Sequence, residues 1–182
     1  MRKRCSWVNY NNPKYINYHD NEWGIPKYDD RELFELLILE SFQAGLSWET
    51  ILNKREYFKE CFDNFDIDKI INYDDFKINE LMNNKNIIRN RLKIESVINN
   101  AKIFKEISSE YECFSNYIWS FANNKIIYEY DKTSSKLSDK ISKDLKSRGM
   151  KFVGTTIIYS YLQAIGIINS HDKKCFMHKE DL

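Results

Sequence analysis

The sequence reads Arg148-Gly149-Met150-Lys151-Phe152-Val153-Gly154-Thr155-Thr156 between a basic segment, 138–147, and an apolar segment, 157–168, which both have helical patterns. Gly149 suits the left-handed position that ends a helix, and Gly154 lets the first amides of the next helix approach a ligand closely. Such amides bind anions, including DNA phosphates, and Lys151 adds positive charge beside them. The stretch 148–156 therefore predicts a helix–hairpin–helix corner that is either a plain structural turn or an anchor for DNA.

The rest of the chain predicts an all-α fold. Five glycines and two prolines interrupt 182 residues, and apolar residues recur between them at three- to four-residue spacing. The stretch 123–135 alternates like a strand but is interpreted as an irregular connection. Without repeats or linkers, residues 1–182 are expected to form a single compact domain. Besides the two helices that flank the hairpin, we expect helices near residues 30–44, 48–58, 66–73, 76–83, 90–107 and 114–122.

Composition and charge limit the possible function classes. A hydrophobic fraction of 42% and an aromatic fraction of 15% are enough for a buried core. The net charge of +1 does not by itself indicate a polyanionic partner, but basic residues dominate two runs, 85–105 and 132–151. Each run is either a solvated helix face or a surface that meets phosphates. No apolar run reaches the ~20 residues of a membrane span, and no signal segment opens the chain, so we expect a cytoplasmic protein without a membrane partner. We also expect a monomer.

Four residues near the chain ends, Cys5, His19, His171 and Cys175, have the composition of a closed zinc site. Zinc takes four thiolate and imidazole ligands in a tetrahedron, and a full set leaves no position for water or substrate. One structural Zn²⁺ per chain would then clip the termini together. Two alternatives stay open: Cys5 is a small hydrophobe beside solvated histidines, or His178 replaces His171 as the partner of Cys175.

Five segments together resemble the bacterial 3-methyladenine DNA glycosylase I family, within the helix–hairpin–helix glycosylase superfamily. The match runs from about residue 5 to 175 in the right order. It implies that the hairpin 148–156 anchors DNA and that the Cys/His quartet is a zinc site joining segments 1–24 and 167–178. The segments that carry the resemblance are Cys5-Ser6-Trp7, Tyr15 to Gly24, Gln43-Ala44-Gly45-Leu46-Ser47-Trp48, Lys151 to Thr156, and His171-x₃-Cys175.

The resemblance also implies DNA contacts and a substrate. It predicts that double-stranded DNA containing 3-methyladenine binds to the protein and that free 3-methyladenine leaves as product, in the bacterial cytoplasm. The loop 43–46 would wedge into the DNA strand, although Phe42 departs from the family's more usual residue at that point. The residues expected to contact DNA are Gln43, Gly45 and Leu46 in this loop and Gly149, Lys151, Gly154 and Thr155 in the hairpin.

A base that leaves the DNA stack needs replacement stacking, and aromatic rings provide it. Methylation at N3 makes the adenine of DNA a cation, which the face of an aromatic ring attracts. The resemblance implies base contact for Tyr15, Tyr18 and Trp48, and Trp7 and Trp23 supply further rings. The alternative for each of these residues is ordinary core packing.

Glu40 lies on the apolar helix expected at 30–44, where a solvated glutamate is the default. The resemblance implies that Glu40 accepts a hydrogen bond from the amine of the base and balances its charge. We also expect this anion to favour the transition state, because the sugar becomes oxocarbenium-like as the base departs. Asn169 stands where the wider superfamily carries a catalytic aspartate, and 154–157 offers no lysine nucleophile. We therefore predict a monofunctional hydrolase. The alternatives are a bifunctional oxidised-base glycosylase and lyase, and a non-enzymatic module that binds alkylated DNA.

Overall fold

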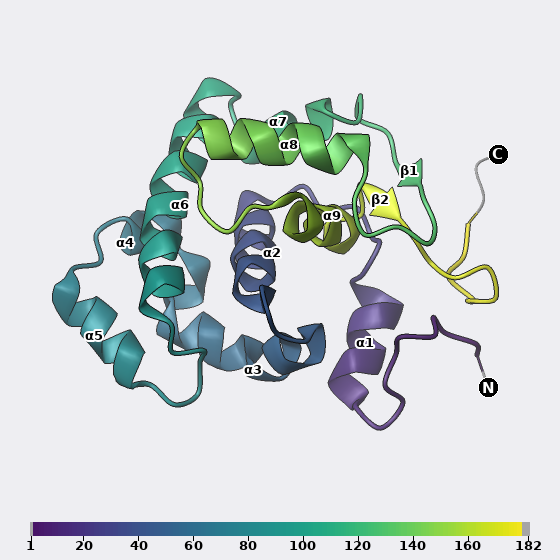
Figure 1. The fold of residues 1–182 in the computed structure, drawn as a ribbon, viewed down its shortest axis with the longest axis horizontal. Coiled ribbons are helices and arrows are strands. Elements are labelled where there is room, and N and C mark those ends of the chain that lie inside the picture. The colour runs from purple at the N-terminus through teal and green to yellow at the C-terminus, as the bar shows by residue number, and fades with distance from the viewer. Residues whose placement is uncertain (1, 180–182) are drawn as a thin grey trace.

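The computed structural model describes residues 2–179, so residues 1 and 180–182 of the expected domain lie outside the described part. The described chain is mostly helical, as predicted, and its elements follow one another as shown in Figure 1. They are α1 (Pro13–Asn21), α2 (Asp30–Gln43), α3 (Trp48–Cys61), η1 (Asp63–Phe65), α4 (Ile67–Ile70), α5 (Asp75–Asn83), α6 (Arg91–Glu110), α7 (Phe114–Ser120), β1 (Ile127–Tyr128), α8 (Lys136–Ser147), α9 (Thr155–Ala164) and β2 (Ile168–Asn169).

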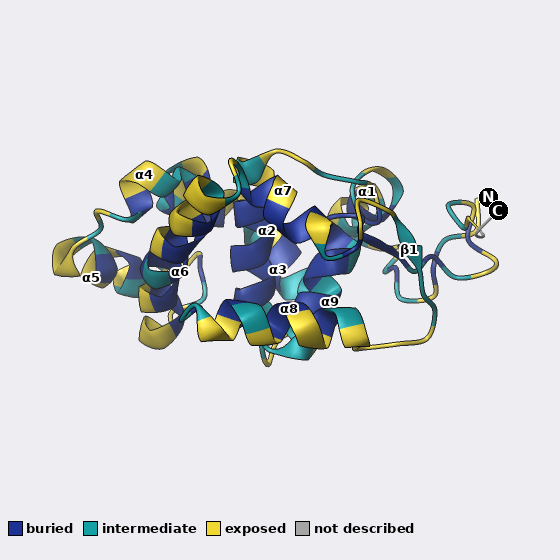
Figure 2. Ribbon diagram, turned by 90° about the horizontal axis from the view of Figure 1, so that it is seen from above, coloured by how far each residue is buried: buried dark blue, intermediate teal, exposed yellow. Residues whose placement is uncertain are grey.

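Helix α2 is the centre of the fold. Asp29 caps its start by accepting hydrogen bonds from the amides of Arg31 and Glu32, both at 3.0 Å. Every residue from 33 to 42 is buried, because α3, α6, α7 and α9 pack around this helix (Figures 1 and 2). A helix that is buried all round can hold a polar side chain away from water. This is the helix that carries Glu40.

The hairpin connects α8 to α9, which lie side by side (Figure 1). Gly149 ends α8 in the left-handed conformation with φ +97°, as predicted. Phe152 also adopts a positive φ, +55°, which is uncommon for a large side chain and needs support from its surroundings. Asn100 of α6 gives that support: its side chain donates to the carbonyl of Lys151 and accepts from the amide of Lys151, both at 2.9 Å.

Several sequence expectations need correction. Helix α1 was not expected, although Asn12 and Pro13 are a good cap and first residue for a helix. The stretch 123–135 contains β1, which pairs in parallel with β2 and so forms a two-stranded sheet. The apolar run 157–168 is helical only as far as Ala164, because the chain then turns at Gly166 with φ +77° and continues into β2.

The first and last described segments meet at one end of the molecule (Figures 1 and 2). The amide of Phe176 donates to the carbonyl of Lys3 at 2.8 Å, and the amide of Ser6 donates to the Asp172 carboxylate at 2.7 Å. Across residues 2–179, no helix combines the length and the apolar character that crossing a membrane requires.

Candidate active site

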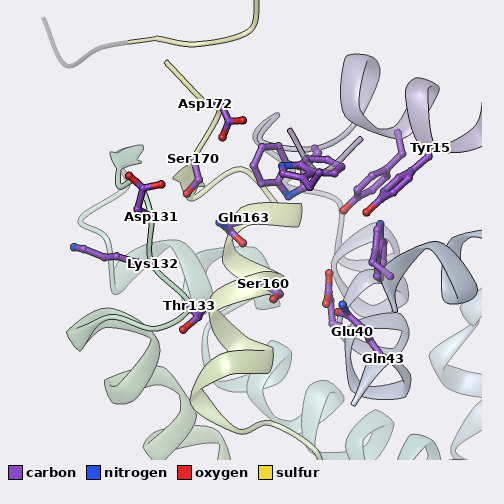
Figure 3. A pocket seen from close by; sticks show the side chains of 14 residues that line it. Tyr15, Glu40, Gln43, Asp131, Lys132, Thr133, Ser160, Gln163, Ser170 and Asp172 are labelled. Carbon is purple, nitrogen blue, oxygen red and sulfur yellow. The ribbon is translucent and has the colours of Figure 1, made fainter. Parts of the chain in front are cut away.

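A cavity of about 390 Å³ opens between α1, α2, the start of α3, and α9 (Figure 3). The structure brings all five predicted aromatic residues and two predicted polar residues into one wall of this cavity. A second, polar wall faces them, and it comes from α9, from the loop after β1 and from the residues after β2. The first wall consists of Trp7, Tyr15, Tyr18, Trp23, Glu40, Gln43 and Trp48, and the second of Asp131, Lys132, Thr133, Ser160, Gln163, Ser170 and Asp172.

Glu40 is the charged group of the aromatic wall, and its side chain reaches the cavity from α2 (Figure 3). It is only 3% exposed, and its Oε2 atom has no hydrogen-bond partner among the described residues. Burial raises the pKa of Glu40 to about 8, since the carboxylate form loses its hydration without gaining a cation. A positively charged ligand in this cavity would supply the missing partner.

Trp48 presents the complementary polar atom. It is the first residue of α3, and its indole Nε1 is a buried donor without a described acceptor. Its ring lies against Tyr18, with centroids 5.2 Å apart. An unsatisfied acceptor on Glu40 and an unsatisfied donor on Trp48 therefore line the same cavity. A planar ligand that carries both a donor and an acceptor on its edge can satisfy the two together.

The other aromatic residues form a connected cluster. Trp7 contacts Tyr15 with centroids 5.3 Å apart and Trp23 at 4.9 Å in an edge-on arrangement. Tyr18 is 2% exposed, and burial, with a smaller effect of the Glu40 charge, raises the pKa of its phenol well above the usual value. Tyr18 therefore stays neutral. The cluster holds ring faces at fixed positions around the carboxylate of Glu40.

The polar wall was missed in the sequence. Ser160 and Gln163 interrupt the apolar run 157–168 at a spacing of three residues, which places them on one face of α9. That interruption was the available signal for a polar lining. No comparable pattern marks Asp131 or Lys132, because they lie in the loop between β1 and α8.

The four predicted metal ligands form one buried cluster. The ligand atoms of Cys5, His19, His171 and Cys175 all lie within 4.8 Å of one another. The sulfur-to-nitrogen distances are 3.4 Å from Cys5 to His171, 3.4 Å from Cys175 to His19 and 3.6 Å from Cys175 to His171. Tetrahedral zinc with ordinary bond lengths separates a sulfur and a nitrogen ligand by roughly 3.6 Å. The donor set and its spacing thus fit Zn²⁺.

The surroundings of the cluster orient its histidines. His19 Nδ1 lies 2.8 Å from the Asp20 carboxylate, and His171 Nε2 lies 3.3 Å from the carbonyl of Trp23, which leaves the other nitrogen of each ring facing the cysteines. His178 instead places its Nδ1 2.7 Å from the backbone carbonyl of His171. The buried cluster therefore contains His171 and not His178.

The predicted DNA contacts lie in two separate segments. The loop 43–46, called here the wedge loop, adjoins the cavity through Gln43 and exposes 41% of Leu46. Between these residues Gly45 turns the chain with φ +81°. The hairpin residues lie elsewhere, and none of them lines the cavity.

At the hairpin, α9 begins at Thr155, and its N-cap Gly154 leaves the first amides without a side-chain acceptor among the described residues. A Cβ added at Gly154 would meet no atom within 4 Å, which leaves the approach open. Thr155 is instead engaged internally, since its hydroxyl donates to Asp139 at 2.6 Å. Gly154 and the exposed Lys151 are thus better placed for an external anion than the Thr155 hydroxyl is.

The two basic runs divide into exposed and engaged residues. Lys143 and Lys146 of α8 are exposed and adjoin the start of α9 in a shallow cavity. Arg148, in contrast, pairs with Glu110 at 2.6 Å and with Asp144 at 2.8 Å. The expectation that a whole run is a solvated or phosphate-facing surface is therefore too simple.

Comparison with known proteins agrees with this geometry. The methyladenine glycosylase family matches residues 7–178. DNA-3-methyladenine glycosylase 1 of Escherichia coli (strain K12) is 44% identical over 179 residues, which is 95% of each chain. A DNA-3-methyladenine glycosylase of Haemophilus influenzae (strain ATCC 51907 / DSM 11121 / KW20 / Rd) is 41% identical over 181 residues, covering 96% of this chain and 97% of the relative.

Solved structures give the same result. A crystal structure of 3-methyladenine DNA glycosylase I superimposes with a TM-score of 0.93 at 44% identity, covering 97% of this chain and all of the other. A Staphylococcus aureus 3-methyladenine DNA glycosylase I, solved to explain 3-methyladenine recognition, has a TM-score of 0.92 at 38% identity and 98% coverage of both chains. This chain belongs to the methyladenine glycosylase family.

Proposed function

We propose that this protein is a monofunctional DNA glycosylase that extrudes 3-methyladenine from alkylated DNA and hydrolyses its N-glycosidic bond. The observation that carries the proposal is Glu40, a buried carboxylate without a cation in a cavity walled by aromatic rings. Such a site favours a planar cation over neutral bases of similar shape. Its relatives bear the name of this activity.

The chemistry follows from the charge of the lesion. In DNA, 3-methyladenine is a cation, so the carbon–nitrogen bond breaks with its electron pair moving to the base, which leaves neutral. The sugar becomes oxocarbenium-like, water adds to C1′, and the proton that this water loses passes to solvent. The Glu40 carboxylate and the Trp48 ring stabilise positive charge as it moves from base to sugar. No acid is needed to protonate the leaving base.

This route explains the modest catalytic apparatus. Asn169, on β2, cannot act as a carboxylate. Lys132 reaches the polar wall, but its ammonium pairs with Glu129 at 3.1 Å, whereas a lyase needs an uncharged amine at the sugar. We therefore favour hydrolysis over lyase chemistry. The buried Glu40 likewise favours an enzyme over a non-enzymatic module, which would not need it.

The proposal extends to the setting of the reaction. One chain supplies both cavity walls, the wedge loop and the hairpin, so we propose one domain over residues 1–182 that acts as a monomer on double-stranded DNA. Its relatives come from bacteria, and we place the protein with the chromosome in the bacterial cytoplasm.

Glu40→Gln should slow single-turnover release of 3-methyladenine from methylated DNA and weaken binding of the free base. The amide has no charge and turns a donor toward the amine of the base, a buried mismatch of about 1–3 kcal/mol, or roughly one to two decades. Tryptophan fluorescence quenching measures base binding. Glu32→Gln, at an exposed position of the same helix, is the matched control. Wild-type rates in Glu40→Gln would contradict the role of Glu40, and a wild-type protein without release would contradict the function.

Glu40→Gln should stabilise the folded protein although it lowers activity. Burial raises the pKa of Glu40 to about 8 from an ordinary 4.5, so ionisation of Glu40 costs folding free energy increasingly as pH rises through this interval. Glu40→Gln should gain stability relative to wild type, by of order 1 kcal/mol or more, between about pH 5 and about pH 9. Thermal unfolding at both pH values measures it. If the stability difference between Glu40→Gln and wild type stayed constant with pH, ionisation of Glu40 would not be coupled to folding, and this prediction would be wrong.

We propose further that Cys5, His19, His171 and Cys175 hold one structural zinc ion. Metal analysis should find one zinc per chain, and Cys175→Ser should lose it together with several kcal/mol of stability, because metal binding and folding are coupled. Excision should fall as well, since Trp7 and α1 lie beside this cluster. Cys113→Ser, a half-buried thiol that caps α7, should keep the metal. Wild-type protein purified without stoichiometric zinc would refute the site.

Lys151→Ala should weaken binding to damaged and undamaged duplexes alike and lower the salt dependence by about one phosphate contact, because phosphate contacts do not read the lesion. Gly154→Val should have a similar effect, since an added Cβ meets nothing within 4 Å and the new side chain would occupy the open approach to α9. Lys105→Ala, whose ammonium pairs with Asp68 on another part of the surface, is the control. Filter binding across a salt series measures these effects. Unchanged affinity and slope in Lys151→Ala would exclude the hairpin as the anchor.

A further inference from the structure

Lys93 is a buried lysine that the proposed chemistry does not use. It is the third residue of α6 and lies within the basic run 85–105, yet it is only 6% exposed. Its ammonium donates to the backbone carbonyls of Phe42 at 2.8 Å and Ala44 at 2.7 Å. Burial lowers the pKa of Lys93, and no described carboxylate pairs with it. A buried lysine without a counter-ion costs folding free energy, so its contacts call for an explanation.

The two carbonyls are at the end of α2, where the wedge loop begins. The last turn of α2 contains no basic residue of its own, so Lys93 supplies positive charge at the negative end of the helix from another element. The amide of Leu46 donates to the carbonyl of Gln43 at 2.7 Å, which closes the loop on itself. Lys93 and this internal bond together fix how the chain leaves α2, and with it the direction of Leu46.

The same helix also holds the hairpin. Asn100, two turns beyond Lys93, fixes Lys151 through two hydrogen bonds, and Asn99 donates to the carbonyl of Gly149 at 3.0 Å. The Lys93 ammonium lies 5.9 Å from the ring centroid of Phe152, the strained residue of the hairpin. Helix α6 therefore sets the spacing between the wedge loop and the hairpin.

We propose that Lys93 is a positioning residue that holds the wedge loop at a fixed place relative to the hairpin, so that the loop can enter the duplex when the lesion leaves it. The inference rests on the proposed glycosylase function. Lys93 acts through the backbone of the loop and touches neither base nor sugar. Its loss should impair extrusion of a paired lesion far more than binding of the free base, since Lys93 does not line the cavity and the wedge loop adjoins the cavity only through Gln43.

Lys93→Met removes the ammonium and keeps the length of the side chain. We expect single-turnover release of 3-methyladenine from a fully paired duplex to slow roughly ten- to hundredfold, the range for a displaced positioning group. Affinity for free 3-methyladenine should stay within about twofold of wild type. The defect should largely disappear when the lesion stands opposite an abasic site, where extrusion needs little help. Lys105→Met, an exposed lysine on the same helix, is the matched control.

A double-mutant cycle tests the route of the effect. If Lys93 acts through the wedge loop, Lys93→Met combined with Leu46→Ala should slow release little more than the stronger single change. If Lys93→Met does not fold, Lys93→Gln, which leaves a shorter donor in place, must show the same pattern.

Several outcomes would overturn the proposal. If Lys93→Met lost affinity for free 3-methyladenine to the same extent as it lost release from paired DNA, Lys93 would be a general structural residue. Equal slowing on paired and unpaired lesions, additive effects with Leu46→Ala, or unchanged release would remove the link to extrusion. A lower salt slope on undamaged DNA would make Lys93 a phosphate contact. Failure of the glycosylase function is distinguishable, because wild-type protein would then release no 3-methyladenine from either substrate.

Discussion

A carboxylate buried without a cation is the constraint on which the rest of the site depends. Glu40 is only 3% exposed although it lines the cavity, because α3, α6, α7 and α9 pack around α2. The cost appears in its pKa, which burial raises to about 8. Ionising buried Glu40 costs free energy in the empty cavity. A ligand that brings the missing positive charge would remove this cost, and the difference would add to its binding free energy. Stability and recognition are in this sense opposed at one residue.

The aromatic wall depends on the chain ends. Trp7, Tyr15, Tyr18 and Trp23 all come from the first 24 residues, which α1 and the Cys/His cluster hold against the segment after β2. A short terminal segment cannot bury enough surface to order itself, so contacts that join it to the far end of the chain substitute for a larger core. Ring placement in the cavity is consequently tied to contacts between residues 156 and 166 positions apart in the sequence.

The sequence predicts local features better than spatial ones. The left-handed Gly149 and the gathering of Cys5, His19, His171 and Cys175 follow from residue chemistry that acts over short distances or through a distinctive ligand set. The polar wall was not predicted, because Ser160 and Gln163 can be recognised as cavity-lining residues only when the position of α9 relative to α2 is known. The same limit applies to charge. Arg148 and Lys93 have the same residue chemistry as solvated cations, but one is paired with carboxylates and the other is buried against carbonyls. The sequence contains no local signal for either partner.

The proposed recognition of charge also explains how an enzyme without a strong general acid would avoid cleaving undamaged bases. Undamaged adenine is neutral, so in this cavity it would leave Glu40 either ionised without a cation or protonated, and neither state returns the cost of burying the carboxylate. The methylated base, in contrast, both offsets that cost and carries its own activation for departure. An enzyme with a strong general acid would hydrolyse either base once it was extruded, whereas a site that supplies mainly an electrostatic partner accelerates only the substrate that is already a cation. On the proposed function, selectivity would reside in the chemical step as well as in binding, and opening of the duplex by the proposed wedge loop and hairpin would not expose normal bases to cleavage.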